Sequence, residues 1–202
     1  MRRGFAAALA LVATFGANAR ATPADDCLAE VKSVLQARLS ALPLREVIDS
    51  SKDGETSHVE LELESLTRFH SLISGPPAVE LLILEGKGWS REHGRWLPFA
   101  AATATAESTI ADEQALADQL TEGATAQCLG QVTHDGAEVV GYTLHLDGDQ
   151  SSGNPYTDLK LYADQRTHLP LAFETTGLGD TGPATGSETF AYPRPLKLAP
   201  PR

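Results

Sequence analysis

Three glutamates stand at every second position of the segment HVELELES, which covers residues 58–65. Side chains two residues apart share one face of a β-strand, so Glu60, Glu62 and Glu64 could hold a divalent cation or form an acid–base pair. The intervening aliphatic residues, Val59, Leu61 and Leu63, favour a simpler interpretation: a strand with one buried face and one solvated face. We assign these glutamates no chemistry.

The histidines are scattered along the chain and form no H-x-x-x-H pair, and no cysteine lies close to any of them; they are His58, His70, His93, His134, His145 and His168. His145 and Asp147 share a strand face and could bind a metal ion weakly. A zinc site needs three or four convergent ligands. The sequence therefore predicts no metal site and no cofactor.

Motifs for covalent catalysis and phosphate binding are also absent from the sequence. No G-x-S-x-G segment is present, and LEGKGWS has neither the spacing of a phosphate-binding loop nor a following helix. Trp89 and Trp96, beside Arg91 and Arg95, could contact a ligand, but packing across a hairpin is the commoner role of such a pair. We predict a protein that is not an enzyme and has no catalytic residues.

The first 21 residues have the pattern of a secretory signal peptide: two arginines, an apolar run and small residues up to Ala21. We expect cleavage near Ala21, a periplasmic location, and a single domain over residues 22–202 that ends in a Pro-rich segment. Three of the 16 basic residues lie in the signal, which leaves 13 basic residues against 27 acidic ones. Nucleic acid and anionic membrane surfaces are therefore disfavoured as partners, because both require a basic surface. No later segment approaches the length of about 20 apolar residues that a spanning helix needs, so no stable membrane insertion is expected.

Cys27 and Cys128 are the two cysteines of the chain. An even pair in an exported protein favours a disulfide bond, whereas a redox-active thiol would need a Cys-x-x-Cys pair or a basic neighbourhood. We expect the bond to tie the start of a first helix to the end of a second helix or to the strand after it.

Those two helices are predicted from apolar spacing. Leu28, Val31, Leu35 and Leu39 recur at helical intervals over residues 25–42, and Pro43 ends the pattern. A second helix is predicted over residues 109–123, preceded by a polar connector, ATATAES. The segment after the first helix, up to SSKDGETS, is assigned no strand.

The rest of the chain alternates in the manner of β-strands. The predicted strands cover residues 59–64, RFHSLI, 79–84, two short runs up to Phe99, CLGQVTHD, AEVVGYTLHLD, the hairpin LKLYADQRTHLPLAFETTG, and SETFAY. Residues 65–67 interrupt the alternation, so a bulge, a bend or a new strand is expected there. The Pro-rich end could add a short edge segment.

This layout resembles the LolA-like superfamily of bacterial periplasmic proteins, which includes lipoprotein carriers, lipid carriers and sensor domains. The phrases that carry the resemblance are LILEGKGWSREHGRWLPF, CLGQVTHDGAEVVGYTLHLD and LKLYADQRTHLPLAFETTG. Relatives often have glycine where His168 stands, which indicates a position with positive φ.

The resemblance implies an α+β fold: a strongly curved antiparallel β-sheet, an incomplete barrel, covered by helices. It further implies a non-enzymatic protein that binds or carries a lipid, another hydrophobic molecule or a lipoprotein between sheet and helices. The alternative is a protein-interaction or envelope-sensor module with a filled core and no ligand. The residues expected on the concave apolar face are Val59, Leu61, Val79, Leu81, Tyr142, Leu144, Leu171 and Phe173.

Overall fold

The computed structural model describes residues 24–52, 54–75, 78–147, 156–178 and 183–201. The expected signal peptide lies outside these residues. The described elements are, in chain order, α1 (Ala24–Ser40), β1 (Leu44–Lys52), β2 (Glu55–Ser65), β3 (Arg68–Ser74), β4 (Val79–Leu84), β5 (Lys87–Glu92), β6 (Arg95–Pro98), α2 (Ala102–Thr121), β7 (Ala124–His134), β8 (Ala137–Asp147), β9 (Tyr156–Ala163), β10 (Pro170–Leu178) and β11 (Pro183–Ala191).

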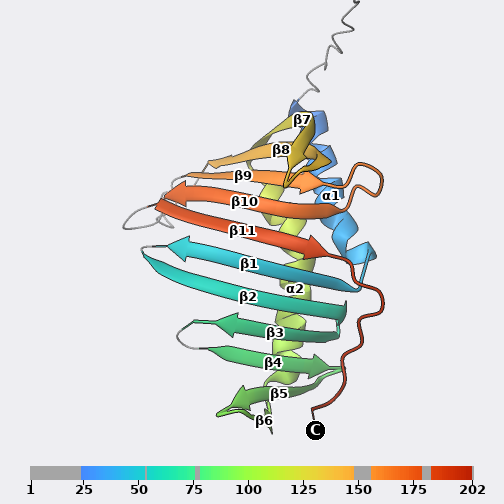
Figure 1. The fold of residues 1–202 in the computed structure, drawn as a ribbon, viewed down its shortest axis with the longest axis vertical. Helices are drawn as coiled ribbons and strands as arrows, with labels where there is room; N and C mark the ends of the chain where they lie inside the picture. The colour runs from blue at the N-terminus through green and yellow to red at the C-terminus, as the bar shows by residue number, and fades with distance from the viewer. Residues whose placement is uncertain (1–23, 53, 76–77, 148–155, 179–182, 202) are drawn as a thin grey trace, which may run out of the picture.

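The eleven strands form one antiparallel sheet with the order β6-β5-β4-β3-β2-β1-β11-β10-β9-β8-β7 (Figure 1). Strands before α2 make one half of the sheet and strands after it make the other half. The halves join where β1 pairs with β11, with Arg45 opposite Ala191 and Lys52 opposite Ala184. The α+β class and the antiparallel sheet are confirmed, while strong curvature stays a prediction.

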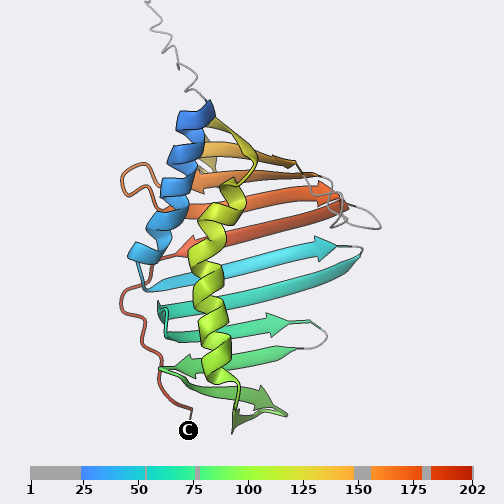
Figure 2. The ribbon, with the colours of Figure 1, turned by 180° about the vertical axis from the view of Figure 1, so that it is seen from behind.

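Both helices lie on the same face of the sheet (Figure 2), which we call the helix-side face. The main core is formed where this face meets the helices. Fully buried side chains there include Val31 of α1, Leu44 of β1, Leu63 of β2, Ile83 of β4 and Leu161 of β9. Alternation along each strand sends the intervening residues to the opposite face, which we call the open face.

The predicted disulfide is present between Cys27 and Cys128, whose Cα atoms lie 5.5 Å apart. It joins the first turn of α1 to edge strand β7. Beside it the hydroxyl of Tyr142 donates a 2.8 Å hydrogen bond to Glu30 of α1. The N-terminal helix is thereby fixed to the far edge of the sheet.

Helix α2 is longer than the sequence predicts, because ATATAES is helical rather than a connector. The small residues of this segment have a packing role: Ala102 and Ala106 are buried. A Cβ atom on Gly88 of β5 would lie 2.4 Å from the Cβ of Ala102. The helix therefore begins in close contact with the sheet, and that contact requires small residues on both sides.

Strand β1 was not predicted, although it lies in the middle of the sheet. Its helix-side positions are Leu44, Glu46 and Ile48, and the carboxylate in the middle breaks the apolar alternation that marks a strand. Glu46 is nevertheless buried, because Arg38 of α1 pairs with it.

The hairpin of residues 159–177 is confirmed as β9 and β10. Asp164 accepts hydrogen bonds from the backbone N–H groups of Arg166 and Thr167, at 3.0 and 2.8 Å, which holds the turn. His168 has φ of 56°, as its replacement of a glycine indicated. The interruption at residues 65–67 is the turn to a new strand, β3.

The Pro-rich end forms no strand within the described residues up to 201. It crosses the ends of the strands instead (Figure 1). The backbone N–H of Leu198 donates to Glu64 at 2.8 Å, and Arg68 donates to the Leu198 carbonyl oxygen at 2.7 Å. No helix in the described part of the chain is long and apolar enough to cross a membrane.

Candidate functional site

A row of directly opposed residues crosses six strands on the helix-side face, from Phe173 through Glu188, Ile48, Val59 and Ile73 to Val79. We call this set the apolar row. Five of its six members are apolar, and the exception is Glu188. Strands lie about 4.8 Å apart, so the stretch from Ile48 to Val79 is about 14 Å long.

The apolar row is less covered than the core beside it. Leu63, Phe69 and Ile83 on the same strands are at most 2% exposed, whereas Val59, Ile73 and Val79 are only half-buried. Figure 2 shows the reason: α2 crosses the sheet transversely, and the strands extend beyond it. A strip of aliphatic side chains is therefore accessible beside the helix.

Helix α2 buries small side chains near both of its ends. Its buried residues are Ala102 and Ala106 near the start and Ala117 and Thr121 near the end. In the middle, Ile110 is half-buried and Glu113 forms an ion pair with Arg38 of α1. The middle of the helix is therefore held to α1 by charge, while its aliphatic side chain there is only partly covered.

A pocket of about 330 Å³ opens at the Phe173 end of the row, between β1, β10 and β11. Its size falls in the range of small-molecule sites. Small residues leave the space: Gly177 lies opposite Ala184, and Gly186 lies opposite Thr175. Around them are Ile48, Phe173 and Glu188, which form its inner end.

Beneath the pocket lies a network of charged side chains from four elements, of which Arg38 and Glu46 are buried and Glu113 and Glu188 half-buried. Arg38 of α1 is 2% exposed and forms ion pairs with Glu46 of β1 and Glu113 of α2. Glu188 of β11 is within electrostatic range of all three. Three carboxylates therefore face one guanidinium.

The pKa values of these carboxyls reflect that imbalance. Burial, and then the charge of Glu46, raise the pKa of Glu188 to about 8. Burial and the charge of Glu113 raise the pKa of Glu46 to about 7, although Arg38 acts in the opposite direction. Burial also raises the pKa of Glu113. A carboxyl that titrates near neutral pH thus lines a half-apolar pocket.

The structure places seven of the eight predicted apolar residues on the helix-side face. Val59, Val79 and Phe173 belong to the apolar row, and Leu61 and Leu81 lie one position closer to the helices. Tyr142 and Leu144 are at most 1% exposed and fill the core. A role of these seven residues in ligand binding stays a prediction.

Leu171 differs from the other seven. A register shift between Pro170 and Ala172 displaces it, and it packs against a small cluster of Val139, Tyr162 and Ala172 on the open face. Simple alternation from Phe173 could not show this, because a bulge changes the face of the residues beyond it.

Sequence reasoning missed Ile48, Ile73 and Glu188 as members of the site. Ile48 belongs to the unassigned strand β1, and Glu188 was treated as part of a final strand with no special role. The available signal was the short alternation Leu44, Glu46, Ile48, which carries one carboxylate among apolar residues.

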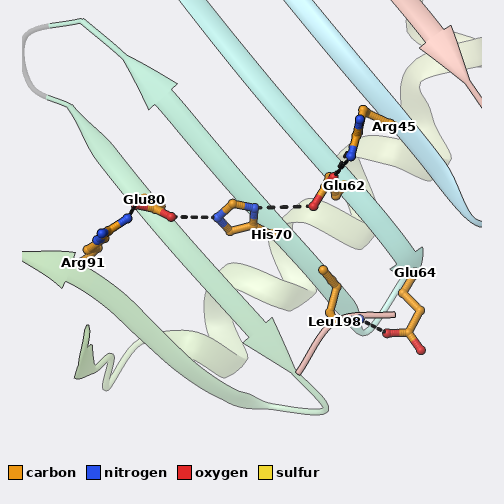
Figure 3. A network of polar contacts seen from close by, with 7 residues as sticks. All are labelled: Arg45, Glu62, Glu64, His70, Glu80, Arg91 and Leu198. Carbon is orange, nitrogen blue, oxygen red and sulfur yellow. Dashed lines mark hydrogen bonds and ion pairs between the residues drawn. The ribbon is translucent and has the colours of Figure 1, made fainter. Parts of the chain in front are cut away.

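The open face carries Glu60, Glu62 and Glu64 of β2. An ion-pair ladder runs from Arg45 to Glu62, His70, Glu80 and Arg91, across β1 to β5 (Figure 3). His70 Nε2 lies 3.1 Å from Glu80, and His70 Nδ1 lies 3.7 Å from Glu62. These carboxylates have cationic partners, so their arrangement fits a structural role on this face.

Neighbouring open-face groups follow the same pattern. Trp96 packs beside Arg91 and edge-on to His70, and Glu64 pairs with Arg68. Within the described residues no group of three or more His, Cys, Asp or Glu side chains is placed to hold a metal ion.

A larger pocket of about 720 Å³ lies toward the loop ends of β1, β2, β3 and β11. Its lining is rich in serine and threonine and includes His58, whose Nδ1 lies 2.7 Å from Asp49. Hydrogen bonds to Asp49 and Glu60 raise the pKa of His58. This pocket contains no large apolar side chain, so it does not suit a hydrophobic ligand.

Comparison with known proteins finds similarity in structure rather than in sequence. No protein-family model matches the chain, and no curated protein matches it. The lipoprotein LppX of Mycobacterium tuberculosis superposes with a TM-score of 0.58 at 12% identity, over 87% of this chain and 99% of that one.

LprF of Mycobacterium bovis superposes with a TM-score of 0.54 at 13% identity, over 86% of this chain and 97% of that one. A LolA superfamily protein from Nitrosomonas europaea also matches, at 14% identity over 86% of this chain and 94% of that one. Its TM-score of 0.29 is too low to support an argument. The antiparallel sheet with two helices on one face is thus the fold of LppX and LprF.

Proposed function

We propose that this protein is a non-enzymatic binding or carrier protein for a hydrophobic ligand, such as a lipid or the acyl chains of a lipoprotein. The observation that carries the proposal is the half-buried apolar row, which leads directly into the pocket at Phe173. Exposed or half-exposed apolar strips of this kind often mark binding sites in soluble proteins.

The ligand's chain would lie along Ile48, Val59 and Ile73, beside α2, and its other end would enter the pocket. Covering such side chains stabilises the complex by about 25 cal/mol for each Å² of apolar surface removed from water. Helix α2 is anchored at its start beside Gly88, in its middle by the Arg38–Glu113 ion pair and near its end beside β7, so it would form a fixed wall beside the ligand.

The test is displacement of the uncharged dye N-phenyl-1-naphthylamine by dodecanol, monitored by fluorescence. We expect saturable binding at one site. The variant Ile73→Ser should weaken binding about fivefold, because one half-covered aliphatic side chain contributes about 1 kcal/mol.

Leu72→Ser is the matched control, since Leu72 is the adjacent, half-buried residue of β3 and its side chain lies on the open face. The affinity of this variant for dodecanol should stay within twofold of the affinity of the original protein. Equal loss in both variants, or no saturable binding, would contradict the proposal.

We further propose that the protein acts in the periplasm after cleavage near Ala21. The Cys27–Cys128 disulfide supports a location outside the cytoplasm, since such bonds persist in oxidising compartments. Cell fractionation, N-terminal sequencing and a non-reducing gel test this location. Recovery of the reduced, uncleaved chain from the cytoplasm would contradict it.

A second candidate function is recognition of an envelope protein without any bound ligand. It is favoured by edge strand β7, which pairs on one side only, with β8, and exposes 38% of Leu129. An extended peptide could add to such an edge. Native mass spectrometry separates the two functions: a carrier isolated from its own periplasm retains a hydrophobic adduct, and a recognition module does not.

A further inference from the structure

One carboxyl group interrupts the otherwise apolar row, and it lines the pocket. Glu188 lies between Phe173 on β10 and Ile48 on β1. A side chain at this position could have been aliphatic like its neighbours in the row. The position therefore gives the site one chemically distinct end.

We propose that the pocket selects amphiphiles whose polar end is positively charged, with the charge beside Glu188 and the chain along Ile48, Val59 and Ile73. This inference rests on the proposed function, because it assigns the class of ligand to the same site. It goes beyond that function by excluding anionic amphiphiles such as free fatty acids as preferred ligands.

The charges around the pocket support a cation. The groups that act on Glu188 come from three packed elements: Arg38 of α1, Glu46 of β1 and Glu113 of α2. Arg38 is already paired with both other glutamates. An ammonium group in the pocket would supply the missing positive charge, whereas a second anion would add to the repulsion that these carboxylates already experience.

Lys52 is the cationic side chain in the described lining of the pocket, and it lies at the opposite end from Glu188. It pairs across the strands with Ala184, four residues before Glu188, which corresponds to about 13 Å along β11. Lys52 is exposed, so water screens its charge. The inner end of the pocket therefore keeps its negative character.

The size of the pocket agrees with a compact polar group. A volume of about 330 Å³ accommodates an ammonium group and the first part of a chain. The small residues Gly177 and Ala184 leave space in the floor of the pocket, while the Thr175 hydroxyl lies over Gly186. Hydroxyl groups of Ser50 and Thr175 in the lining can accept further N–H donors.

Binding of a cation should also change the protonation of Glu188. Burial and neighbouring charge raise the pKa of Glu188 to about 8, so this carboxyl is mostly protonated at pH 7. A bound ammonium group favours the carboxylate form. Binding of an amine should therefore release a proton, and affinity for the amine should rise between pH 6 and pH 9.

The test compares dodecylammonium, dodecanol and dodecanoate by isothermal titration calorimetry at pH 8, with the two ions below their micelle concentrations and dodecanol below its solubility limit. A hydrogen bond to a charged group corresponds to about tenfold to a hundredfold in affinity. We expect dodecylammonium to bind at least tenfold more tightly than dodecanol, and dodecanoate to bind more weakly than both. Repeating the titration in two buffers of different ionisation enthalpy measures the released proton.

The variant Glu188→Gln should abolish the advantage of dodecylammonium over dodecanol and the proton release that accompanies amine binding. Glu138→Gln is the control, because it makes the same chemical change at an exposed position on β8, outside the pocket. It should change none of the three affinities.

The outcomes separate the two proposals. Dodecanol binding with no preference for the amine, or a preference that survives in Glu188→Gln, would overturn the selectivity and leave the carrier function intact. Absence of binding by all three probes would overturn both.

Discussion

Replacing Glu188 by glutamine should stabilise the folded protein, and the gain should depend on pH. The pKa of Glu188 is raised from 4.5 to about 8 by burial and by the charge of Glu46. Between these two values the unfolded chain has an ionised Glu188 and the folded protein has a protonated one. Folding then takes up a proton, so the free energy of unfolding falls as pH rises through this window.

The size of the effect follows from the shift. One pH unit corresponds to about 1.36 kcal/mol, so a shift from 4.5 to about 8 corresponds to a loss of about 5 kcal/mol at most by pH 9. Glutamine has no charge to bury. We expect Glu188→Gln to match the original protein near pH 4.5 and to exceed its stability by several kcal/mol at pH 9.

Urea denaturation at pH 4.5, 7 and 9, with the disulfide intact, measures this difference. Glu138→Gln serves again as the control, because an exposed carboxylate should give the same small difference at every pH. If the stability curves of Glu188→Gln and the original protein run parallel from pH 4.5 to 9, Glu188 is not the buried, neutral carboxyl described above.

Three further changes test other contacts. Arg38→Met should lower the free energy of unfolding by about 3–5 kcal/mol at pH 8 and by less at pH 5, because it leaves the buried Glu46 without its cation. Urea denaturation measures both values, and an equal loss at the two pH values would argue against this reasoning. Replacing Cys27 and Cys128 by alanine should lower the free energy of unfolding by about 4–5 kcal/mol, since the disulfide closes a loop with a sequence separation of 101. An unchanged urea midpoint would refute a role of the disulfide in stability. His168→Gly should raise the free energy of unfolding by about 0.5–1 kcal/mol, and with it the melting temperature, because φ of 56° favours glycine. A lower melting temperature would show that the His168 side chain stabilises the fold by more than its backbone strain costs.

The parts of the fold that sequence reasoning predicted correctly are those held by local contacts. The β9–β10 hairpin is set by the hydrogen bonds of Asp164 within its own turn. The β7–β8 turn has positive φ at Asp135 and Gly136, as an Asp-Gly pair predicts. Helix α1 is marked by its own apolar spacing and ended before Pro43.

The parts that it missed depend on distant partners. Strand β1 lacks a clean apolar alternation because Glu46 is buried against Arg38, which lies on another element. The first turns of α2 consist of small residues because Gly88 lies close to Ala102. Neither contact leaves a periodic signal in its own segment, so local pattern reading assigns a loop or a connector in both places.

The candidate site combines both kinds of information. Val59 lies in a strand whose clean alternation groups it with Leu61 and Leu63, whereas the strand of Val79 is apolar on both faces, so alternation alone does not select its face. Ile48 and Glu188 join them only through the pairing of β1 with β11. Most of the chain lies between these two strands in the sequence. The register of that pair is not encoded in either segment by itself.

The β1–β11 junction also explains why the pocket and the charge network occur together. It joins the two halves of the sheet, and Arg38 reaches it from α1 while Glu113 reaches it from α2. Small residues of β10 and β11 leave the pocket open on one side of Glu188, and Arg38 with its two glutamates occupies the other side. A ligand that binds beside Glu188 would therefore contact both halves of the sheet and alter the electrostatics that hold both helices, so binding and global stability should be coupled at this junction.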